Sequence, residues 1–398
     1  MKKSLLAVAA IGAFASAAQA QASVTVYGIL DVGFSGSTSR VPALTSGSTT
    51  TPAYKTNATA FGAGAETTSR LGFRGTEDLG GGTSAFFTIE MQLAPNNDNN
   101  FTNMTNRQTF VGLKKNGLGQ AAVGTQYTPI HTAVGATDPG QQNNVHGNVI
   151  YAVNTTTANS GQSIAYTVRQ NNAVTVATDR FAGFRLNAIY SNNMADRSQN
   201  AADYTGTAAT NGGNTNSQAW GIGADYTWNK LFATAAYQVL KNESANVAGA
   251  TATLTAISST VGTNVPVING TSAQTYAGAT YDFGILKAYA QYINNKTESN
   301  INSNIFLKRS AQQLGVRSFI TPTIEGWASI GNGRYSAFGS GQPTANFTGY
   351  QLGANYLLSK RTNLYAIYGS SQSSTVSSTV VNGAAGNSAY AVGVRHTF

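Results

Sequence analysis

The last eleven residues of the chain, 388–398 (SAYAVGVRHTF), alternate between two kinds of side chain, as in a β-strand with two different faces. One face carries large, mostly apolar side chains, and the other carries small or polar ones. The chain then stops at Phe398 without a polar tail. In a water-soluble sheet such a strand would form an exposed, adhesive edge. The pattern therefore favours a sheet that closes on itself, with this strand completing the ring.

The first strand of the same kind, residues 23–34 (SVTVYGILDVGF), is the natural partner for this closure. Pairing the first strand with the last removes both edges of the sheet. In a bilayer the closure is compulsory, because hydrocarbon offers no partner for an unpaired backbone amide. We therefore predict an all-β fold, a transmembrane antiparallel β-barrel. A water-soluble β-sandwich that ends by chance on an aromatic residue is the alternative.

Composition supports export to a bacterial envelope. Two lysines, Lys2 and Lys3, follow the initiating Met. Residues 5–14 are apolar, and residues 18–20 (AQA) form a small-x-small cleavage site. This pattern predicts a signal peptide over residues 1–20 and a mature barrel over residues 21–398. The chain has no cysteine, and only 10% of its residues are charged, against about 25% in a soluble domain. Outside the leader, no apolar run is long enough for a membrane-spanning helix.

Alternating segments separated by turn residues predict sixteen strands, an even number, as closure with both termini on one side requires. Short turns such as 116–119 (NGLG) and 229–230 (NK) alternate with long polar connections, which predicts short periplasmic turns and long extracellular loops. The Ser/Thr/Gly-rich tract 35–65 is interpreted as the first of these loops. The predicted strands cover about 23–34, 67–76, 84–93, 107–114, 119–127, 163–169 and beyond, 184–190, 219–228, 231–238, 274–281, 286–292, 311–319, 323–330, 347–357, 362–369 and 388–398.

Several segments together resemble the general porins of Gram-negative outer membranes, closest to the type found in Burkholderia-like bacteria. These segments are spread from the first strand to the last: 23–34, 69–82 (SRLGFRGTEDLGGG), 107–114 (RQTFVGLK), 126–129 (QYTP), 358–366 (LSKRTNLYA) and 393–398 (GVRHTF). The resemblance implies a homotrimer of sixteen-stranded barrels. Each barrel would hold a water-filled pore, narrowed by a loop that folds inward.

The resemblance also implies where the pore is narrowest. The constriction loop would be residues 128–161, and the facing wall would carry Arg70 and Arg107, with Arg74 on the same face as Arg70. Arg169 is a looser match. In many relatives this loop carries several acidic groups, whereas here it holds only Asp138. A constriction that attracts cations is therefore not expected.

The charge balance points to anions. Removal of Lys2 and Lys3 from the 24 basic residues leaves 22 against 15 acidic residues, a net charge of +7. The side chains assigned to the lumen by alternation are mainly basic, and such a field in a narrow aqueous pore favours anion entry. The basic residues are scattered rather than clustered, which argues against nucleic-acid binding. The inward set is Arg70, Arg74, Arg107, Arg169, Arg185, Lys287, Arg317 and Arg395 against Asp31, Glu90, Asp225 and Glu325.

No catalytic or cofactor site is predicted. Cysteine is absent, and the histidines are His131, His146 and His396. His131 and His146 share the predicted loop, but they lack HxxxH spacing and nearby carboxylates, so no metal site is assigned. Residues 80–82 (GGG) are a turn, since neither Lys-Ser/Thr nor a helix follows them.

We therefore predict a non-enzymatic porin of the cell outer membrane that passes small hydrophilic solutes by passive diffusion and prefers anions. A substrate-selective channel for organic acids or phosphate is one alternative, and a surface adhesin or receptor acting through its long loops is another. The expected partners are two further copies of the chain, outer-membrane lipid and lipopolysaccharide, and the transported anions and other solutes. Phe398 is expected to be needed for barrel closure and for recognition by the barrel-insertion machinery.

Overall fold

The structure is a computed structural model that describes residues 23–41, 43–46, 49–96, 104–151, 165–197, 213–244, 270–300, 303, 306–337, 344–374 and 385–398. The predicted signal peptide over residues 1–20 lies outside these ranges, as do residues 152–164 of the region around the predicted constriction loop. No helix in the described residues is long and apolar enough to cross a membrane.

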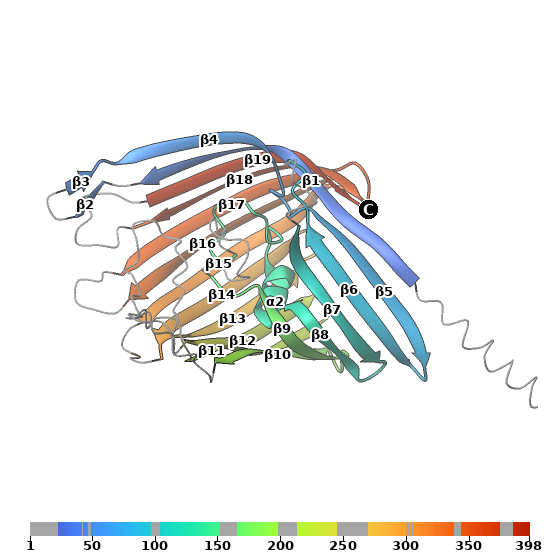
Figure 1. Cartoon of the computed structure of the whole chain (residues 1–398). Coiled ribbons are helices and arrows are strands. Elements are labelled where there is room, and N and C mark those ends of the chain that lie inside the picture. The colour runs from blue at the N-terminus through green and yellow to red at the C-terminus, as the bar shows by residue number, and fades with distance from the viewer. Residues whose placement is uncertain are drawn as a thin grey trace, which may run out of the picture.

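Seventeen strands form one antiparallel sheet that closes into a barrel (Figure 1). The closing pair is β1 (Ser23–Val41) with β19 (Ala385–Thr397), in a register that places Ile29 opposite Thr397. The predicted closure of first strand on last is confirmed. The remaining long strands are β5 (Arg70–Gly80), β6 (Thr83–Gln92), β7 (Thr105–Lys115), β8 (Gly119–Tyr127), β9 (Arg169–Thr178), β10 (Phe184–Arg197), β11 (Gly213–Trp228), β12 (Leu231–Ser244), β13 (Gly270–Asp282), β14 (Lys287–Ser299), β15 (Phe306–Thr321), β16 (Ile324–Ala337), β17 (Ala345–Leu357) and β18 (Thr362–Ser373).

The tract 35–65 is not the loop that the sequence suggested. Strand β1 continues to Val41 and turns back as β4 (Tyr54–Ala63), with the short pair β2 (Leu44–Ser46) and β3 (Thr49–Thr51) at the tip. Strand β1 pairs with β5 along its first part and with β4 along its second part, so β4 and β5 occupy one strand position. The barrel therefore has sixteen strand positions, as predicted.

A second correction concerns the strand predicted to begin at residue 163. Strand β9 begins at Arg169, and residues 165–168 precede it, with a single bridge at Thr167. Ala165, Tyr166 and Thr167 are buried, because this stretch packs inside the barrel instead of lying in its wall. The apolar and polar residues of this stretch alternate as they would in a strand. Here the alternation reflects packing inside the barrel and not a position in its wall.

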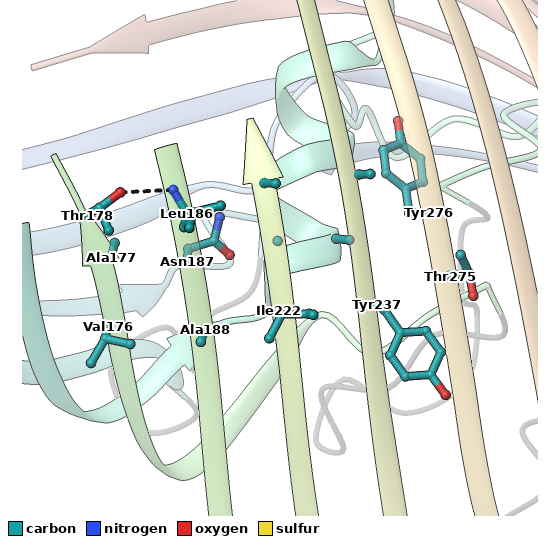
Figure 2. A pocket seen from close by; sticks show the side chains of 14 residues that line it. Val176, Ala177, Thr178, Leu186, Asn187, Ala188, Ile222, Tyr237, Thr275 and Tyr276 are labelled. Atoms are coloured by element: carbon teal, nitrogen blue, oxygen red, sulfur yellow. Dashed lines mark hydrogen bonds between the residues drawn. The ribbon is translucent and has the colours of Figure 1, made fainter. Parts of the chain in front are cut away.

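The two faces of the wall differ as the alternation predicts. Neighbouring positions Ala236 and Tyr237 on β12 illustrate this, since Ala236 is buried and Tyr237 is partly exposed on the outer face. Figure 2 shows this part of the outer wall, where β9 to β13 form a shallow, almost entirely apolar groove of about 580 Å³. Exposed aromatic side chains form two bands on the outside. One band contains Tyr190, Trp220, Tyr292, Tyr350, Tyr368 and Tyr390, and the other contains Phe184, Trp228, Tyr281, Phe283, Tyr356 and Phe398.

Figure 1 shows the C-terminus and the hairpin turns of β5–β8 at one end of the barrel, with β2 and β3 at the other. Helix α2 (Pro129–Thr137) lies inside the barrel. It begins at Thr128, whose side chain accepts a hydrogen bond from the backbone of His131, and Pro129 occupies the first turn. Both features are standard helix-start signals. Ile130 and Val134 are fully buried on the side that faces the wall.

Candidate functional site

Residues 128–151, which follow β8, fold into the barrel and attach to one half of its wall. Their apolar side chains, including Ile130, Val134 and Ile150, pack with inward residues of β12–β17 in one buried cluster. A buried apolar cluster is unusual in the water-filled interior of a barrel. It shows that this half of the wall serves as the seat of the loop.

Buried glutamines on the same strands fix the loop backbone. Gln238 on β12 accepts a hydrogen bond from Ile130 N at 3.4 Å and donates to Thr167 O at 3.1 Å. Gln313 on β15 accepts from Val149 N at 3.1 Å, and Gln351 on β17 donates to Val145 O at 2.6 Å. A glutamine side-chain amide can both donate and accept a hydrogen bond. It can therefore bond to the loop backbone in place of the backbone of a neighbouring strand. The complete set, which we call the glutamine belt, is Gln238, Gln274, Gln291, Gln313 and Gln351.

Glycines in the wall leave room for the loop. The backbone of His146 lies directly over Gly369 on β18, the backbone of Gly147 over Gly349 on β17, and the side chain of Val149 over Gly331 on β16. A Cβ atom at Gly369 would overlap the carbonyl oxygen of His146, and one at Gly349 would overlap that of Gly147. The wall therefore lacks side chains where the loop crosses it. Sequence reasoning missed both the glutamine belt and these glycines, although their inward positions on successive strands were a usable signal.

Asp138 has a structural position in this loop. Its carboxylate is only 2% exposed and accepts hydrogen bonds from Gln142 N at 2.6 Å and from Asn148 Nδ2 at 3.0 Å. Gln313 Nε2 donates to it at 3.3 Å. Burial raises the pKa of Asp138, while the hydrogen bonds from Gln142 and Asn148 and the charge of Arg317 act in the opposite direction. The carboxylate of Asp138, the single acidic residue of the loop, thus points into the protein interior.

The opposite half of the wall carries the predicted arginines. Glu90 on β6 is their centre: Arg107 Nε donates to its carboxylate at 2.7 Å, and Arg70 lies 3.7 Å away. Tyr27 donates a hydrogen bond to the other carboxylate oxygen at 3.2 Å. The intervening position on β5 is Gly72, where a Cβ would overlap the Tyr27 ring. Glycine is needed there to let Tyr27 reach Glu90.

A β-bulge aims Arg107 at this centre. The pairing of β6 with β7 shifts register between Glu90 and Met91, so that Gln108 lies opposite Glu90 and Asn106 opposite Met91. Arg107 is left between the two pairs, and its side chain is 7% exposed and turned inward. Bulges commonly redirect one side chain in this way. Strict alternation from Gln108 would have placed Arg107 on the lipid face.

Arg74 and Arg169 extend the basic wall without acidic partners among the described residues. Arg74 lies over the ring of Tyr27, 5.2 Å from its centre, and Arg169 lies over Tyr127 at 5.9 Å. Arg107 also donates to the Tyr127 hydroxyl at 2.7 Å. Within the described residues, therefore, Glu90 pairs with two of these four guanidinium groups, and the other two have no carboxylate partner. The structure brings Arg70, Arg107 and Arg169 together around Glu90 and Tyr127, with Arg74 beside them on β5.

Histidine 131 is the loop residue that faces this basic wall. Its ring packs against Tyr127, with centroids 4.4 Å apart, and its Nδ1 lies 3.1 Å from Gln142 Nε2 and 3.2 Å from the Tyr166 hydroxyl. Burial lowers the pKa of His131 well below its ordinary value, and the charges of Arg169, Arg107 and Arg70 act in the same direction. A neutral, buried ring with these partners suits packing. The described residues hold no group of three or more His, Asp or Glu side chains that could bind a metal ion.

Most other inward charges are paired or hydrogen-bonded. Arg317 forms two hydrogen bonds with Glu325, and Arg395 lies 3.6 Å from Glu66. Asp31 accepts a hydrogen bond from the Tyr365 hydroxyl at 2.6 Å, and Asp225 accepts one from Thr234 at 2.7 Å. These acidic groups of the lumen are thus engaged. Four guanidinium groups lie on β5, β7 and β9, and Arg309 on β15 is a further buried guanidinium without an ion-pair partner among the described residues, which donates to the Tyr335 hydroxyl at 3.1 Å.

Comparison with known proteins gives consistent results. A family model described as Gram-negative porin matches residues 7–376. An outer membrane porin protein of Bordetella pertussis is 29% identical over 423 aligned positions, covering all of both chains. An outer membrane porin protein of Delftia acidovorans is 36% identical over 135 residues, 32% of this chain and 33% of the relative.

Solved structures share the fold. An anion-selective porin from Comamonas acidovorans superposes with a TM-score of 0.67 at 20% sequence identity, covering 95% of this chain and all of that one. OmpT of Vibrio cholerae superposes with a TM-score of 0.59 at 14% identity, covering 95% of this chain and 98% of that one.

Proposed function

Because this chain belongs to the Gram-negative porin family, we propose that its outer-membrane barrel is a passive channel for small hydrophilic solutes that prefers anions. The observation that carries the preference is the basic wall: Arg70 and Arg107 pair with Glu90, while Arg74 and Arg169 have no carboxylate partner among the described residues. Within low-dielectric walls such a surplus of one sign raises the local concentration of counter-ions. The related fold of an anion-selective porin supports the same proposal.

The loop supports the preference by removing its own charge from the lumen. Asp138 is buried against Asn148 and Gln313, and His131 is held neutral by burial. The passage between loop and wall is therefore lined on one side by cations and on the other by uncharged groups. We assign Asp138 to holding the loop in shape, and we expect its replacement by Asn to leave selectivity unchanged or more anionic.

Recording in planar bilayers tests the proposal. In a salt gradient, the reversal potential of the purified channel should have the sign of a chloride preference over potassium. The preference should shrink as salt rises, because the screening length falls from roughly 10 Å at 0.1 M to 3 Å at 1 M. A cation-selective channel would overturn the anionic mechanism.

The same recording separates the other functions. Ohmic current without saturation supports diffusion, whereas a current that saturates with one organic acid or phosphate supports a selective channel. One observation favours the selective channel. The Arg107 guanidinium donates to the Tyr127 hydroxyl, and a guanidinium beside a hydroxyl resembles an anion-binding pair. A chain that assembles but never opens would point to a surface adhesin or receptor. We infer no catalytic activity, since the family consists of channels.

We further propose a homotrimer that packs through the barrel side near β1. An exposed aromatic cluster lies on that side, with Phe34 next to Phe61 at 5.4 Å and next to Tyr390 at 6.2 Å. Phe61 is 80% exposed, which is costly unless another apolar surface covers it. In mild detergent the protein should migrate as a species of about three chains until heated, as closed cyclic symmetry requires. A monomeric mass in several detergents would contradict this.

A further inference from the structure

Residues 64–69, which join β4 to β5, turn into the barrel instead of continuing its wall. We call this segment the connector. Gly64 begins it with a φ of 78°, in the left-handed region that glycine adopts most easily. Glu66 and Ser69 are buried. The connector is therefore an inner element at the base of the extended hairpin that β1 and β4 form.

A buried carboxylate on β1 fixes the connector to the closing seam. Asp31 is fully buried, and its two carboxylate oxygens accept hydrogen bonds from Thr67 N and from the Tyr365 hydroxyl, each at 2.6 Å. The backbone carbonyl oxygen of Asp31 accepts from Gly64 N at 2.9 Å, and its N–H donates to Ser69 Oγ at 2.9 Å. Loss of one donor would leave a buried charge unsatisfied, which is costly. The connector is therefore held firmly to β1.

The connector also contacts the last two strands of the barrel. Asn363 on β18 donates to Glu66 Oε2 at 3.0 Å, and Arg395 on β19 lies 3.6 Å from the same oxygen. Ala65 packs against a buried cluster that consists of Val145, Trp327, Tyr365, Ile367 and Ala391. Val145 belongs to the inward loop, so this cluster places the loop beside the connector.

One loop residue makes the hydrogen bonds that join the loop to the connector. Asn144 N donates to Ala65 O at 2.9 Å, and the Asn144 side-chain amide donates to Gly64 O at 2.6 Å and to Thr68 Oγ1 at 3.3 Å. Within the described part of the chain, every hydrogen bond between residues 128–151 and the connector comes from Asn144. Asn144 is thus the point at which the loop leaves its seat and meets the connector.

The hairpin above the connector is open to contact from outside. Residues 54–61 of β4 are all exposed, and Figure 1 shows the hairpin running to the end of the barrel remote from the C-terminus. Segments with few buried contacts are the parts of a fold that are most easily displaced. The pairing of β4 with β1 from Ala63 to Tyr54 makes the hairpin one stiff unit. A displacement of its tip therefore reaches the connector at its base.

We propose that the connector couples the hairpin to the aperture, so that a displacement of the hairpin shifts the constriction loop through Asn144. This rests on the proposed channel function, in which the end remote from the C-terminus faces outward. The connector is tied to β1 through the Asp31 carboxylate, whereas the loop is tied to its seat through neutral glutamine amides. Hydrogen bonds to a charged group are the stronger kind. When the hairpin moves, the loop seat therefore yields before the connector does.

A bound protein supplies the displacement that tests this inference. The chain contains no cysteine, so Y54C gives a single thiol near the hairpin tip, which is biotinylated and then bound by streptavidin during recording in a planar bilayer. Streptavidin should change the single-channel conductance of biotinylated Y54C. The matched control is M194C on β10, since Met194 is 57% exposed and Tyr54 is 55% exposed. Biotinylated M194C should show no change.

Two loop variants separate coupling from a loosened loop. In Y54C/N144A the side-chain bonds to the connector are lost, and the response to streptavidin should fall about fivefold, as for a coupling of ordinary size. In Y54C/N143A the loop instead loses two hydrogen bonds of 3.0 Å with Gln351 on the wall, and the response should persist. Heat-modifiable migration on gels checks that each variant is folded.

Each outcome has a distinct meaning. Absence of a response in Y54C, or an equal response in M194C, overturns the coupling. An undiminished response in Y54C/N144A means that streptavidin obstructs the pore directly, and an equal loss in both loop variants means that the loop is merely loosened; either result also overturns it. The conductance and reversal potential of the unlabelled protein test the proposed channel function separately, so that function can hold even if the coupling fails.

Discussion

Phe398 and Gly28 exchange two backbone hydrogen bonds of 3.1 Å, one in each direction, and the Phe398 ring lies over the space where Gly28 has no side chain. Together they form the end of the seam between β1 and β19. The last residue of the chain is thus paired through both its backbone and its ring.

Deletion of Phe398 should lower the amount of folded barrel. The deletion removes both hydrogen bonds, worth about 1 kcal/mol each, and exposes the end of the seam. The measurement is heat-modifiable protein in outer-membrane fractions. Phe181→Ala is the control, since it removes an even more exposed aromatic ring from a turn without touching the seam. Equal assembly of the deletion variant and the unmodified protein would refute the role of Phe398.

Replacing Arg70 and Arg107 together by Gln should reduce the anion preference by roughly half, because two of the four cations of the basic wall are removed. The reversal potential at low salt measures the change. Glu90 would then lack its partners, so the triple variant R70Q/E90Q/R107Q separates loss of cations from exposure of the carboxylate. The triple variant should recover part of the preference. An unaltered reversal potential in the double variant would show that these arginines do not set selectivity.

Gly369→Val should widen the pore. The new side chain would overlap the His146 carbonyl oxygen, and strain on the order of 1–3 kcal/mol should push the loop off its seat. Single-channel conductance should rise while the barrel stays folded, since valine suits a strand. Gly386→Val on β19 is the control, because the nearest atoms to a Cβ at that position are 3.8 Å away, an ordinary van der Waals contact. Equal conductance in both variants would mean that the loop does not limit the current.

Acidification should loosen the loop through His131. While the loop is seated, the pKa of His131 is well below 6.5, and release would restore the ordinary value. The stability that neutral His131 gives to the seated loop is therefore complete above about pH 6.5, and it decreases as the pH falls toward the lowered pKa. Current fluctuations should increase between pH 7.5 and 5.5 in the unmodified protein and increase less in His131→Gln, where His146 of the same loop, whose pKa burial also lowers, remains.

Asp138 acts in the opposite sense, which provides the control for the pH experiment. The pKa of Asp138 is raised in the seated loop, so protonation of Asp138 favours seating. The stability that protonated Asp138 gives to the seated loop is lost as the pH rises through that pKa. In the double variant H131Q/H146Q, acidification should therefore leave fluctuations constant or reduce them. An acid-induced increase that persists in this variant would exclude the two histidines as its source.

The alternation of apolar and polar residues predicted the closed barrel, its sixteen strand positions and the seam, because lipid selects apolar residues at every second position. It failed at 35–65, where β1 and β4 extend beyond the apolar band and Ser, Thr and Gly replace apolar residues on both faces. Arg107 does lie inward as expected, but its direction depends on a bulge, which alternation alone does not predict. The loop seat was hidden for another reason: each glutamine is an ordinary polar lumen residue until residues 128–151 pack on it.

The attachment of the loop by amides and glycines has an evolutionary consequence. In the proposed channel, the loop seat on β12–β18 would set the aperture, whereas the sign of the field would depend on a few side chains of β5, β7 and β9. A lineage that moves to a habitat with different nutrients can exchange those few charged residues without redesigning the aperture. Sieving and charge discrimination are thus heritable traits that can diverge independently within one barrel.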